Sequence, residues 1–538
     1  MRQGLPRLAA TAACAALMLL AVAPAVPPTP DRALAADRGL VLIVQTRYDA
    51  IPDAARVHVM LDAVATSYTP NSGNTIYYYN SALFSVQPGI VQLAASSGSI
   101  GLGATVARTA SDHTEIKVAF AREVFYRQSY SFRVTFDLPD PGGVPNRDLR
   151  IGKSIVAFPV WAFGSESEPG STVRVVLPKG FTPSVQGDTM TTSTGAGGGV
   201  VLSALTIPDP IVFFAYVSAD RPGAFVSTDF SVPVAGESAS VEVQAWDDDA
   251  AWGTRMKSLM TDGLPTLAEL IGLTWPVAGD LKIEEAATSR LGAYAGTYDN
   301  VTQTIRVRYD ADGVVALHEG AHIWFNRDLF PDVWLLEAWA EFYGVQAASS
   351  VGASGAGYEL TDDLLRSKIP LNDWAGIVSP GPPNDYAYAA SYHLATLIFA
   401  RTDLAGLRSV WKAAKNGEMA YQPANATGQP QVAGVIAANG WEAVLDLLEQ
   451  RTGANYDDLW SAWVVNPDQA KLMAARAKAR TEYLALESDA GKWDLPQGVR
   501  FEMGAWNFDA ATKDLQAASL VLGERDQIAS GATMLGLT

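Results

Sequence analysis

The sequence predicts a multidomain α+β protein, in which an N-terminal antiparallel β-sandwich precedes a mixed domain and a C-terminal helical region. The chain has 538 residues, too many for one hydrophobic core. Strand-like runs fill residues 39–244, strand and helix patterns mix after them, and the last part has helical periodicity. The predicted domains are residues 37–245, 246–465 and 466–538.

Composition favours a globular protein and argues against a nucleic-acid partner. Hydrophobic residues make up 48% of the chain and charged residues 18%, which is too apolar for a disordered chain. There are 39 basic and 57 acidic residues, giving a net charge of −18. No segment concentrates the positive charge that phosphate binding requires, so we expect no nucleic-acid binding.

Residues 1–36 have the features of a secretory signal peptide. Arg2 and Arg7 precede an apolar run over residues 8–26, and small residues near Ala35 and Ala36 suit cleavage. This predicts a secreted or extracellular protein, with the cell surface as a variant of that location. The alternative, an uncleaved anchor, would bring the chain into contact with a membrane. The one cysteine, Cys14, lies inside the apolar run, so the mature chain would have no disulfide.

The first predicted domain consists of short runs rich in β-branched and aromatic residues. Examples are "LVLIVQTRYDA", "HTEIKVAFA" and "QSYSFRVTFDLP", and Pro, Gly, Asn and Asp clusters separate such runs. Sheets built this way bury one face, which predicts an antiparallel sandwich. The glycine clusters at 98–103 and 195–199 are interpreted as hairpin loops.

A change of pattern marks the predicted second domain. Asp247, Asp248 and Asp249 indicate a helix N-terminus, where carboxylates accept hydrogen bonds from free amides. Strand patterns return at "LKIEEA", "GAYAGTYD" and "TQTIRVRYD". We therefore expect strands and helices to mix in this domain.

The segment "DADGVVALHEGAHIWF" predicts a helix that carries metal ligands. Its apolar residues have helical spacing, and Asp310 or Asp312 can cap it. His318 and His322 then lie one turn apart on one face, so both imidazoles can reach one metal ion. Glu319 would lie beside the metal, where it can take a proton from water. Two incidental histidines on an apolar helix would be costly without partners.

A second helix, "PDVWLLEAWAEFYG", offers the third ligand. Asp332 is in position to cap it, and Glu337 and Glu341 lie four residues apart on one face. One carboxylate can bind zinc while the other accepts the second ring N–H of a ligand histidine. A catalytic zinc site requires three protein ligands and one open position, which this set provides.

These two motifs resemble the gluzincin metallopeptidases, a group that includes thermolysin and the aminopeptidase N family, and most closely the peptidase MA-like group. The resemblance implies a thermolysin-like zinc-peptidase domain with one zinc ion, a peptide or protein substrate, His318, His322 and Glu337 as ligands, and Glu319 as general base. Glu341 would be the carboxylate that supports a ligand histidine. The aminopeptidase N spacing would instead select Glu341 as ligand, whereas the local sequence "WLLEAW" favours Glu337.

The order of domains also resembles the aminopeptidase N family. Residues 292–300 occupy the place of that family's substrate-binding edge strand, but its Gly-Ala-Met-Glu-Asn signature is absent. The family's glutamate there binds the free α-amine of the substrate, so its absence argues against strict aminopeptidase activity. Glu284 and Glu285 are nearby acidic residues that could replace it.

A predicted helix over residues 384–400 carries the candidate for stabilising the oxyanion. The family has a tyrosine here, and Tyr388, with Ser391 three residues later, fits its context best. Tyr386 and His393 form a rival pair on a different face. The functional alternative to an active peptidase is a catalytically inactive extracellular binding module on the same fold.

Overall fold

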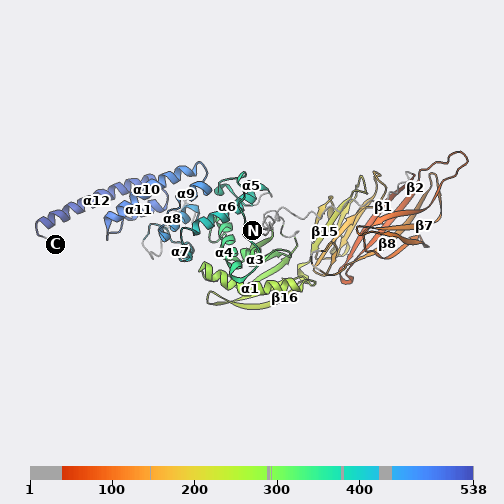
Figure 1. Ribbon diagram of the computed structural model, residues 1–538, viewed down its shortest axis with the longest axis horizontal. Helices are drawn as coiled ribbons and strands as arrows, with labels where there is room; N and C mark the ends of the chain where they lie inside the picture. Colours follow the sequence, from red (N-terminus) through yellow and green to blue (C-terminus); the bar gives the residue numbers. More distant parts are fainter. Residues whose placement is uncertain are drawn as a thin grey trace, which may run out of the picture.

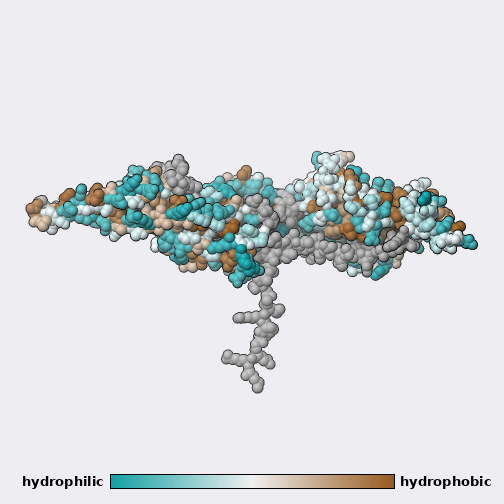
Figure 2. Space-filling model, turned by 90° about the horizontal axis from the view of Figure 1, so that it is seen from above, coloured by the Kyte–Doolittle hydropathy of each residue, from teal (hydrophilic) through white to brown (hydrophobic). Residues whose placement is uncertain are grey.

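The computed structural model describes residues 39–143, 145, 147–287, 291, 294–376, 381–422 and 439–536. These residues form an elongated molecule (Figures 1 and 2). Figure 1 shows β-sheets at one end, a mixed centre and helices at the other end. The predicted signal peptide lies outside the described residues. In the ranges above, no helix has the length and apolarity needed to cross a membrane.

Three sheets make up the first part of the described chain. One has the order β13 (Thr191–Thr194), β14 (Val200–Ala204), β11 (Thr172–Leu177), β1 (Leu40–Ile51), β2 (Arg56–Ser67), β8 (Ser129–Pro139), β4 (Val91–Ser97) and β5 (Ile100–Leu102). The second consists of β12 (Thr182–Gly187), β15 (Phe214–Asp220), β10 (Ile155–Trp161) and β9 (Arg150–Ile151). The third consists of β3 (Tyr78–Val86), β7 (Thr114–Phe125) and β6 (Ala104–Thr109).

The inward side chains of these sheets form one core, as the alternation of apolar residues predicts. In β1 and β2 buried and more exposed residues alternate, which is the signature of strands with one buried face. One part of the prediction is wrong: β1 pairs with β11 in parallel, with Gln45 opposite Thr172, so the sheet is mixed and not purely antiparallel. Strand direction depends on how the chain connects one strand to the next. The alternation of apolar and polar residues is the same in parallel and antiparallel strands, so it cannot predict this direction.

The second part is built on a sheet with the order β16 (Val226–Val234), β17 (Glu237–Ala245), β18 (Asp280–Ala286), β20 (Thr304–Arg308) and β19 (Gly296–Asp299). β17 pairs in parallel with β18, so β16 and β17 belong to this sheet and not to the sandwich. The sheet therefore begins at Val226, ahead of the boundary expected at residue 245. The reason is that the hairpin buries Val232 and Val241 in the core of the second part, while its alternating pattern is the same as that of a sandwich strand.

Helices cover this sheet and continue to the end of the described chain. The main ones are α1 (Ala250–Ile271), α3 (Gly313–Ala321), α4 (Val333–Val351), α5 (Asp362–Leu365), α6 (Pro382–Phe399), α7 (Leu404–Lys415), α8 (Trp441–Thr452), α9 (Asp457–Leu459), α10 (Gln469–Ala490), α11 (Gln497–Gly504) and α12 (Phe508–Met534). Asp249 caps α1 by accepting a hydrogen bond from the Trp252 amide, as predicted.

The sandwich and the second part meet at a cluster of ion pairs. Asp248, just before α1, accepts hydrogen bonds from Arg147 at 2.9 Å and from Arg150 at 2.5–2.8 Å. Arg147 also pairs with Asp140, which follows β8. The guanidinium of Arg150 lies 4.5 Å from the ring centre of Trp246, so the same arginine contributes packing as well as charge.

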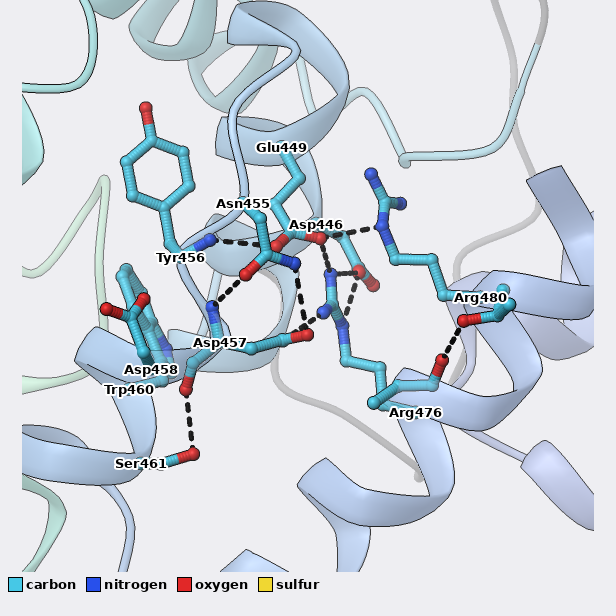
Figure 3. Close-up of polar contacts among 12 residues, drawn as sticks. Asp446, Glu449, Asn455, Tyr456, Asp457, Asp458, Trp460, Ser461, Arg476 and Arg480 are labelled. Atoms are coloured by element: carbon cyan, nitrogen blue, oxygen red, sulfur yellow. Dashed lines mark hydrogen bonds and ion pairs between the residues drawn. The ribbon is translucent and has the colours of Figure 1, made fainter.

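A buried arginine joins the C-terminal helices to the second part. Arg476 of α10 lies among carboxylates of α8 and α9, as Figure 3 shows. Its guanidinium donates to Asp446 at 2.5–2.8 Å, to Glu449 at 2.6 Å and to Asp457 at 2.6 Å. Arg480 also lies 2.7 Å from Glu449. Both buried carboxylates of this cluster, Asp446 and Glu449, therefore have a cationic partner. The side chains of α10 to α12 also share the core of the second part, although residues 466–538 were predicted as a separate region.

We predict that Arg476→Met lowers the free energy of unfolding by about 3–5 kcal/mol, because it leaves buried carboxylates without their counter-charge. Chemical unfolding followed by tryptophan fluorescence measures this, since Trp506 donates to Asp446 at 2.7 Å. The matched control is Lys471→Met in the same helix. Lys471 pairs with Asp468 on the surface, with 80% of its side chain exposed, so we expect a change below about 1 kcal/mol. Equal effects of the two variants would contradict the prediction.

Candidate metal centre

Two helices in close contact bring the predicted ligands together. Asp312 caps α3 by accepting a hydrogen bond from the Val315 amide. α3 ends at Ala321, so His322 lies at its C-cap, but its amide still bonds to the carbonyl of His318 at 3.2 Å. A Cβ on Gly344 of α4 would lie 2.8 Å from the His318 backbone nitrogen, so only glycine allows this approach.

The cap of α4 differs from the prediction in one detail. Asp332 occupies the N-cap position, but its side chain makes no capping hydrogen bond. Its carboxylate accepts a hydrogen bond from the Trp441 amide at 2.8 Å, at the start of α8. The Asp332 carboxylate thus bonds to Trp441 and not to its own helix. The sequence around α4 cannot predict a contact with a residue so far along the chain.

Three donor atoms converge between α3 and α4. The Nε2 atoms of His318 and His322 lie 3.0 Å apart. Oε2 of Glu337 lies 3.3 Å from Nε2 of His318 and 3.5 Å from Nε2 of His322. Among the described residues, these three form a group whose ligand atoms all lie within 4.8 Å of one another.

These separations match the coordination sphere of zinc. Zinc bonds of about 2.0–2.1 Å at tetrahedral angles place neighbouring ligand atoms about 3.3 Å apart. The measured distances of 3.0, 3.3 and 3.5 Å bracket that value. The group could therefore hold a metal ion, and two nitrogens with one carboxylate oxygen form a donor set that suits zinc.

The outer nitrogen of each histidine has its own partner. Nδ1 of His318 lies 2.8 Å from Oε2 of Glu341, and Nδ1 of His322 lies 2.9 Å from the Phe325 carbonyl oxygen. In a neutral imidazole such bonds hold the proton on Nδ1 and leave Nε2 free to bind a metal. Glu341 in turn accepts a hydrogen bond from the Tyr358 amide at 3.2 Å. Glu341 thus lies behind His318, on the side away from the three donors.

Glu337 and the two histidines shift each other's pKa values. Burial would raise the pKa of Glu337, but His322 and the hydrogen bonds from both histidines hold that pKa well below its ordinary value. Burial would lower the pKa of His318, but its bonds to Glu337 and Glu341 raise that pKa well above its ordinary value. Glu337 is therefore ionised, as a metal-binding carboxylate must be.

Glu319 is buried beside this group and packs against the edge strand. A Cβ on Gly296, the first residue of β19, would lie 2.6 Å from Cγ of Glu319. Because residue 296 has no side chain, the Glu319 side chain can lie against the backbone of β19. Burial raises the pKa of Glu319, and this favours the protonated form more than in water.

Tyr388 and its two rivals lie on α6 in different surroundings. Burial raises the pKa of Tyr388, and the charges of Glu337 and Glu319 raise it further. Burial alone raises the pKa of Tyr386 to about 12 and lowers that of His393. His393 packs edge-on against Trp463, with ring centres 5.2 Å apart.

α6 starts earlier than predicted. Its first residue is Pro382, a favoured type at this position, whereas the sequence predicted a helix that begins at residue 384. The Asn384 side chain accepts a hydrogen bond from the Trp374 indole at 3.0 Å. Trp374 packs against Tyr388, with ring centres 4.8 Å apart, and so helps to fix that tyrosine.

Two further tyrosines are affected by the carboxylates of the group and were not identified from the sequence. Burial, and then the charges of Glu337 and Glu319, raise the pKa of Tyr294, just before β19. Tyr358, which follows α4, has its pKa raised by burial and by the charges of Glu341, Glu337 and Glu319. Tyr294 lies within the quoted edge-strand segment, which was a signal that could have been used. Tyr358 lies in a loop without any local pattern.

The two acidic residues proposed to replace an amine-binding glutamate are engaged elsewhere. Glu284 accepts a hydrogen bond from Arg306 at 3.1 Å. Glu285 is fully buried and accepts one from the Trp246 amide at 2.8 Å, and burial raises its pKa to about 9. That carboxyl is neutral at pH 7.

Comparison with known proteins gives distant structural neighbours. The chain is similar to the crystal structure of an M1 zinc metallopeptidase from Deinococcus radiodurans, at 15% identity and a TM-score of 0.33, covering 80% of this chain and 96% of that one. A mutant of it bound to a Tyr-Ser-Ala substrate gives 15% identity and a TM-score of 0.29, covering 80% and 95%. No family model and no curated protein matches the sequence. A likeness at this level assigns no activity, so the function depends on the geometry of the site.

Proposed function

We propose that this chain is a zinc-dependent peptidase of the gluzincin type, with one zinc ion held by His318, His322 and Glu337. One observation carries the proposal: three donor atoms lie 3.0–3.5 Å apart, with the outer nitrogens of both histidines already hydrogen-bonded. Three protein ligands leave one coordination position open, which is the arrangement of catalytic sites.

The residues around the group supply the remaining chemistry. A bound zinc ion acts as a Lewis acid that makes water more acidic and polarises a carbonyl. Glu319 takes a proton from the attacking water and passes it to the leaving amine. The Tyr388 hydroxyl donates a hydrogen bond to the oxyanion that forms on the substrate carbonyl. Hydrolysis of a peptide bond requires these steps.

We predict that Tyr388→Phe lowers kcat by about 10²–10³-fold, the loss typical of one oxyanion donor. The matched control is Tyr386→Phe on the same helix. The Tyr386 hydroxyl is buried and has no hydrogen-bond partner among the described residues, so its removal should leave kcat nearly unchanged. Steady-state kinetics on one peptide compares the two variants. A larger loss of kcat in Tyr386→Phe than in Tyr388→Phe would show that Tyr386, and not Tyr388, stabilises the oxyanion.

The proposal favours an active enzyme over an inactive binding module. An inactive module has no need of a general base, yet Glu319 is buried at an energetic cost beside the donor group. For location, we propose export from the cell, supported by the signal-peptide features of residues 1–36. N-terminal sequencing of the exported protein would test the cleavage near Ala36.

The direct test is digestion of a peptide library by the purified protein, with and without a chelator, using free and N-blocked peptides. We expect cleavage that the chelator abolishes and added zinc restores. We also expect N-blocked peptides to be cleaved, because Glu284 and Glu285 are engaged in other contacts. Metal analysis should find one zinc per chain. No cleavage by a zinc-loaded protein would refute the proposal.

A further inference from the structure

One end of the sandwich is formed by three segments joined by backbone hydrogen bonds. They are the entry into β1 at Gly39, the loop between β2 and β3, and the turn between β7 and β8. The Tyr68 amide donates to the Gly39 carbonyl, and the Arg127 amide donates to the Ser67 carbonyl at 2.7 Å. We call this end, residues 39, 67–79 and 125–131, the distal pole.

The distal pole lies far from the metal centre. β2 runs from Arg56 to Ser67, and Arg56 pairs with Pro139 at the end next to Asp140 and the junction with the second part. Eleven steps of about 3.3 Å place the two ends of β2 about 36 Å apart. In Figure 1 the pole is the end beyond the β2 and β7 labels, opposite to the end that faces β15 and the helices.

Large apolar and aromatic side chains project from the distal pole into solvent. Each is at least 37% exposed, and they are Tyr68, Ile76, Tyr77, Tyr78, Phe125 and Tyr126. The loop that carries three of them is ordered by its own bonds. Asn71 accepts from the Tyr77 amide at 3.2 Å, and Ser72 and Thr75 form a two-residue bridge. The aromatic groups are thus presented on a fixed scaffold, which lowers the entropic cost of binding.

The charge of the pole is opposite to that of the whole chain. Residues 67–79 and 125–131 contain no acidic residue and one basic residue, Arg127, although the chain has a net charge of −18. Arg127 lies 5.2 Å from the ring centre of Tyr126. Arg122 is held at the same end by bonds to Gln128 and the Ser129 carbonyl. Going back along β7, the first acidic residue is Glu123.

We propose that the distal pole docks onto the surface of an anionic lipid bilayer. Tyrosine rings are favoured at the membrane–water interface, where one part of the side chain is apolar and the other wet. Arg122 and Arg127 would contact the anionic headgroups. An anionic bilayer suits this pole, because the pole presents exposed aromatic rings and its residues 67–79 and 125–131 include no acidic residue.

The described part of the chain begins at this same pole, at Gly39. The apolar run of residues 8–26 precedes Gly39 by twelve residues, 27–38, which can span at most about 43 Å. A membrane that takes up the apolar run during export is therefore within reach of the pole. Docking in this way would point the metal centre away from the bilayer, toward substrates in solution. The inference stands whether or not the proposed peptidase activity is confirmed.

The test is flotation of the chain beginning at Asp37 with vesicles of phosphatidylcholine, alone or mixed equally with phosphatidylglycerol. All described elements lie within residues 39–536, so this form keeps every contact of the fold. We expect binding to the anionic vesicles, weakened about tenfold or more by Tyr68→Ser combined with Tyr77→Ser and Tyr78→Ser. Arg122→Gln with Arg127→Gln should remove the preference for anionic vesicles.

A matched control removes exposed apolar side chains at the opposite end of the molecule. Leu520 and Ile528 of α12 are each 73% exposed, and Leu520→Ser with Ile528→Ser should bind vesicles like the parent. Circular dichroism of every variant checks that the fold is intact. Failure of the parent to bind anionic vesicles would overturn the proposal and favour a protein partner for the pole. Equal loss in the pole and α12 variants would overturn it as well.

Discussion

Glu319→Gln is expected to give a folded, zinc-loaded protein that has lost hydrolysis by about 10²–10⁴-fold, the range for loss of a general base. Glutamine keeps the size of glutamate, which matters because Glu319 is buried against Gly296. It cannot take a proton from the attacking water. Metal analysis, circular dichroism and kcat on one peptide measure the three properties separately.

Each measurement on Glu319→Gln excludes a different alternative. Full activity would show that the proton goes elsewhere, and the mechanism would be wrong. Loss of zinc would show that Glu319 holds the metal site together, because His318 and His322 are unchanged in this variant. The inactive-module hypothesis predicts no turnover in the parent protein, so a chelator-sensitive parent activity contradicts it.

The sequence was sufficient to predict the parts of the site that lie on regular helices. The four-residue spacing of His318 and His322 fixes their common face wherever the helix lies. The same argument places Glu337 and Glu341 on one face but cannot say which of them meets the metal. That choice depends on the approach of the two helices at Gly344, a tertiary contact. Tyr358 lies on a loop after α4, and no periodicity can bring a loop residue to a site.

The sequence predicted where strands lie along the chain better than it predicted which strands pair with each other. Alternation identified strands such as β1 and β7, because burying one face of a sheet requires it. It could not identify the core that a strand joins, so β16 and β17 were assigned to the sandwich although β17 pairs with β18. Nor could it reveal the parallel pairing of β1 with β11. Such features depend on contacts between residues far apart in the sequence.

Glu337→Ala should abolish zinc binding, whereas Glu341→Ala should weaken zinc affinity or activity by about 10–100-fold. Glu337 places its oxygen 3.3 and 3.5 Å from the two inner nitrogens, so its loss removes one of three donors. Glu341 contacts the outer nitrogen of His318, at 2.8 Å, and not the inner one, so its loss leaves all three donors in place.

Zinc content after dialysis, and competition with a chelator of known affinity, would rank the two variants of this pair. Glu341→Gln is the informative control, because an amide can still accept a hydrogen bond from Nδ1 of His318 while carrying no charge. We expect its affinity to fall between those of the parent and Glu341→Ala. If Glu341→Ala lost zinc while Glu337→Ala kept it, the longer aminopeptidase N spacing would identify the ligand. The two helices would then have to pack in another register than the one that Gly344 allows.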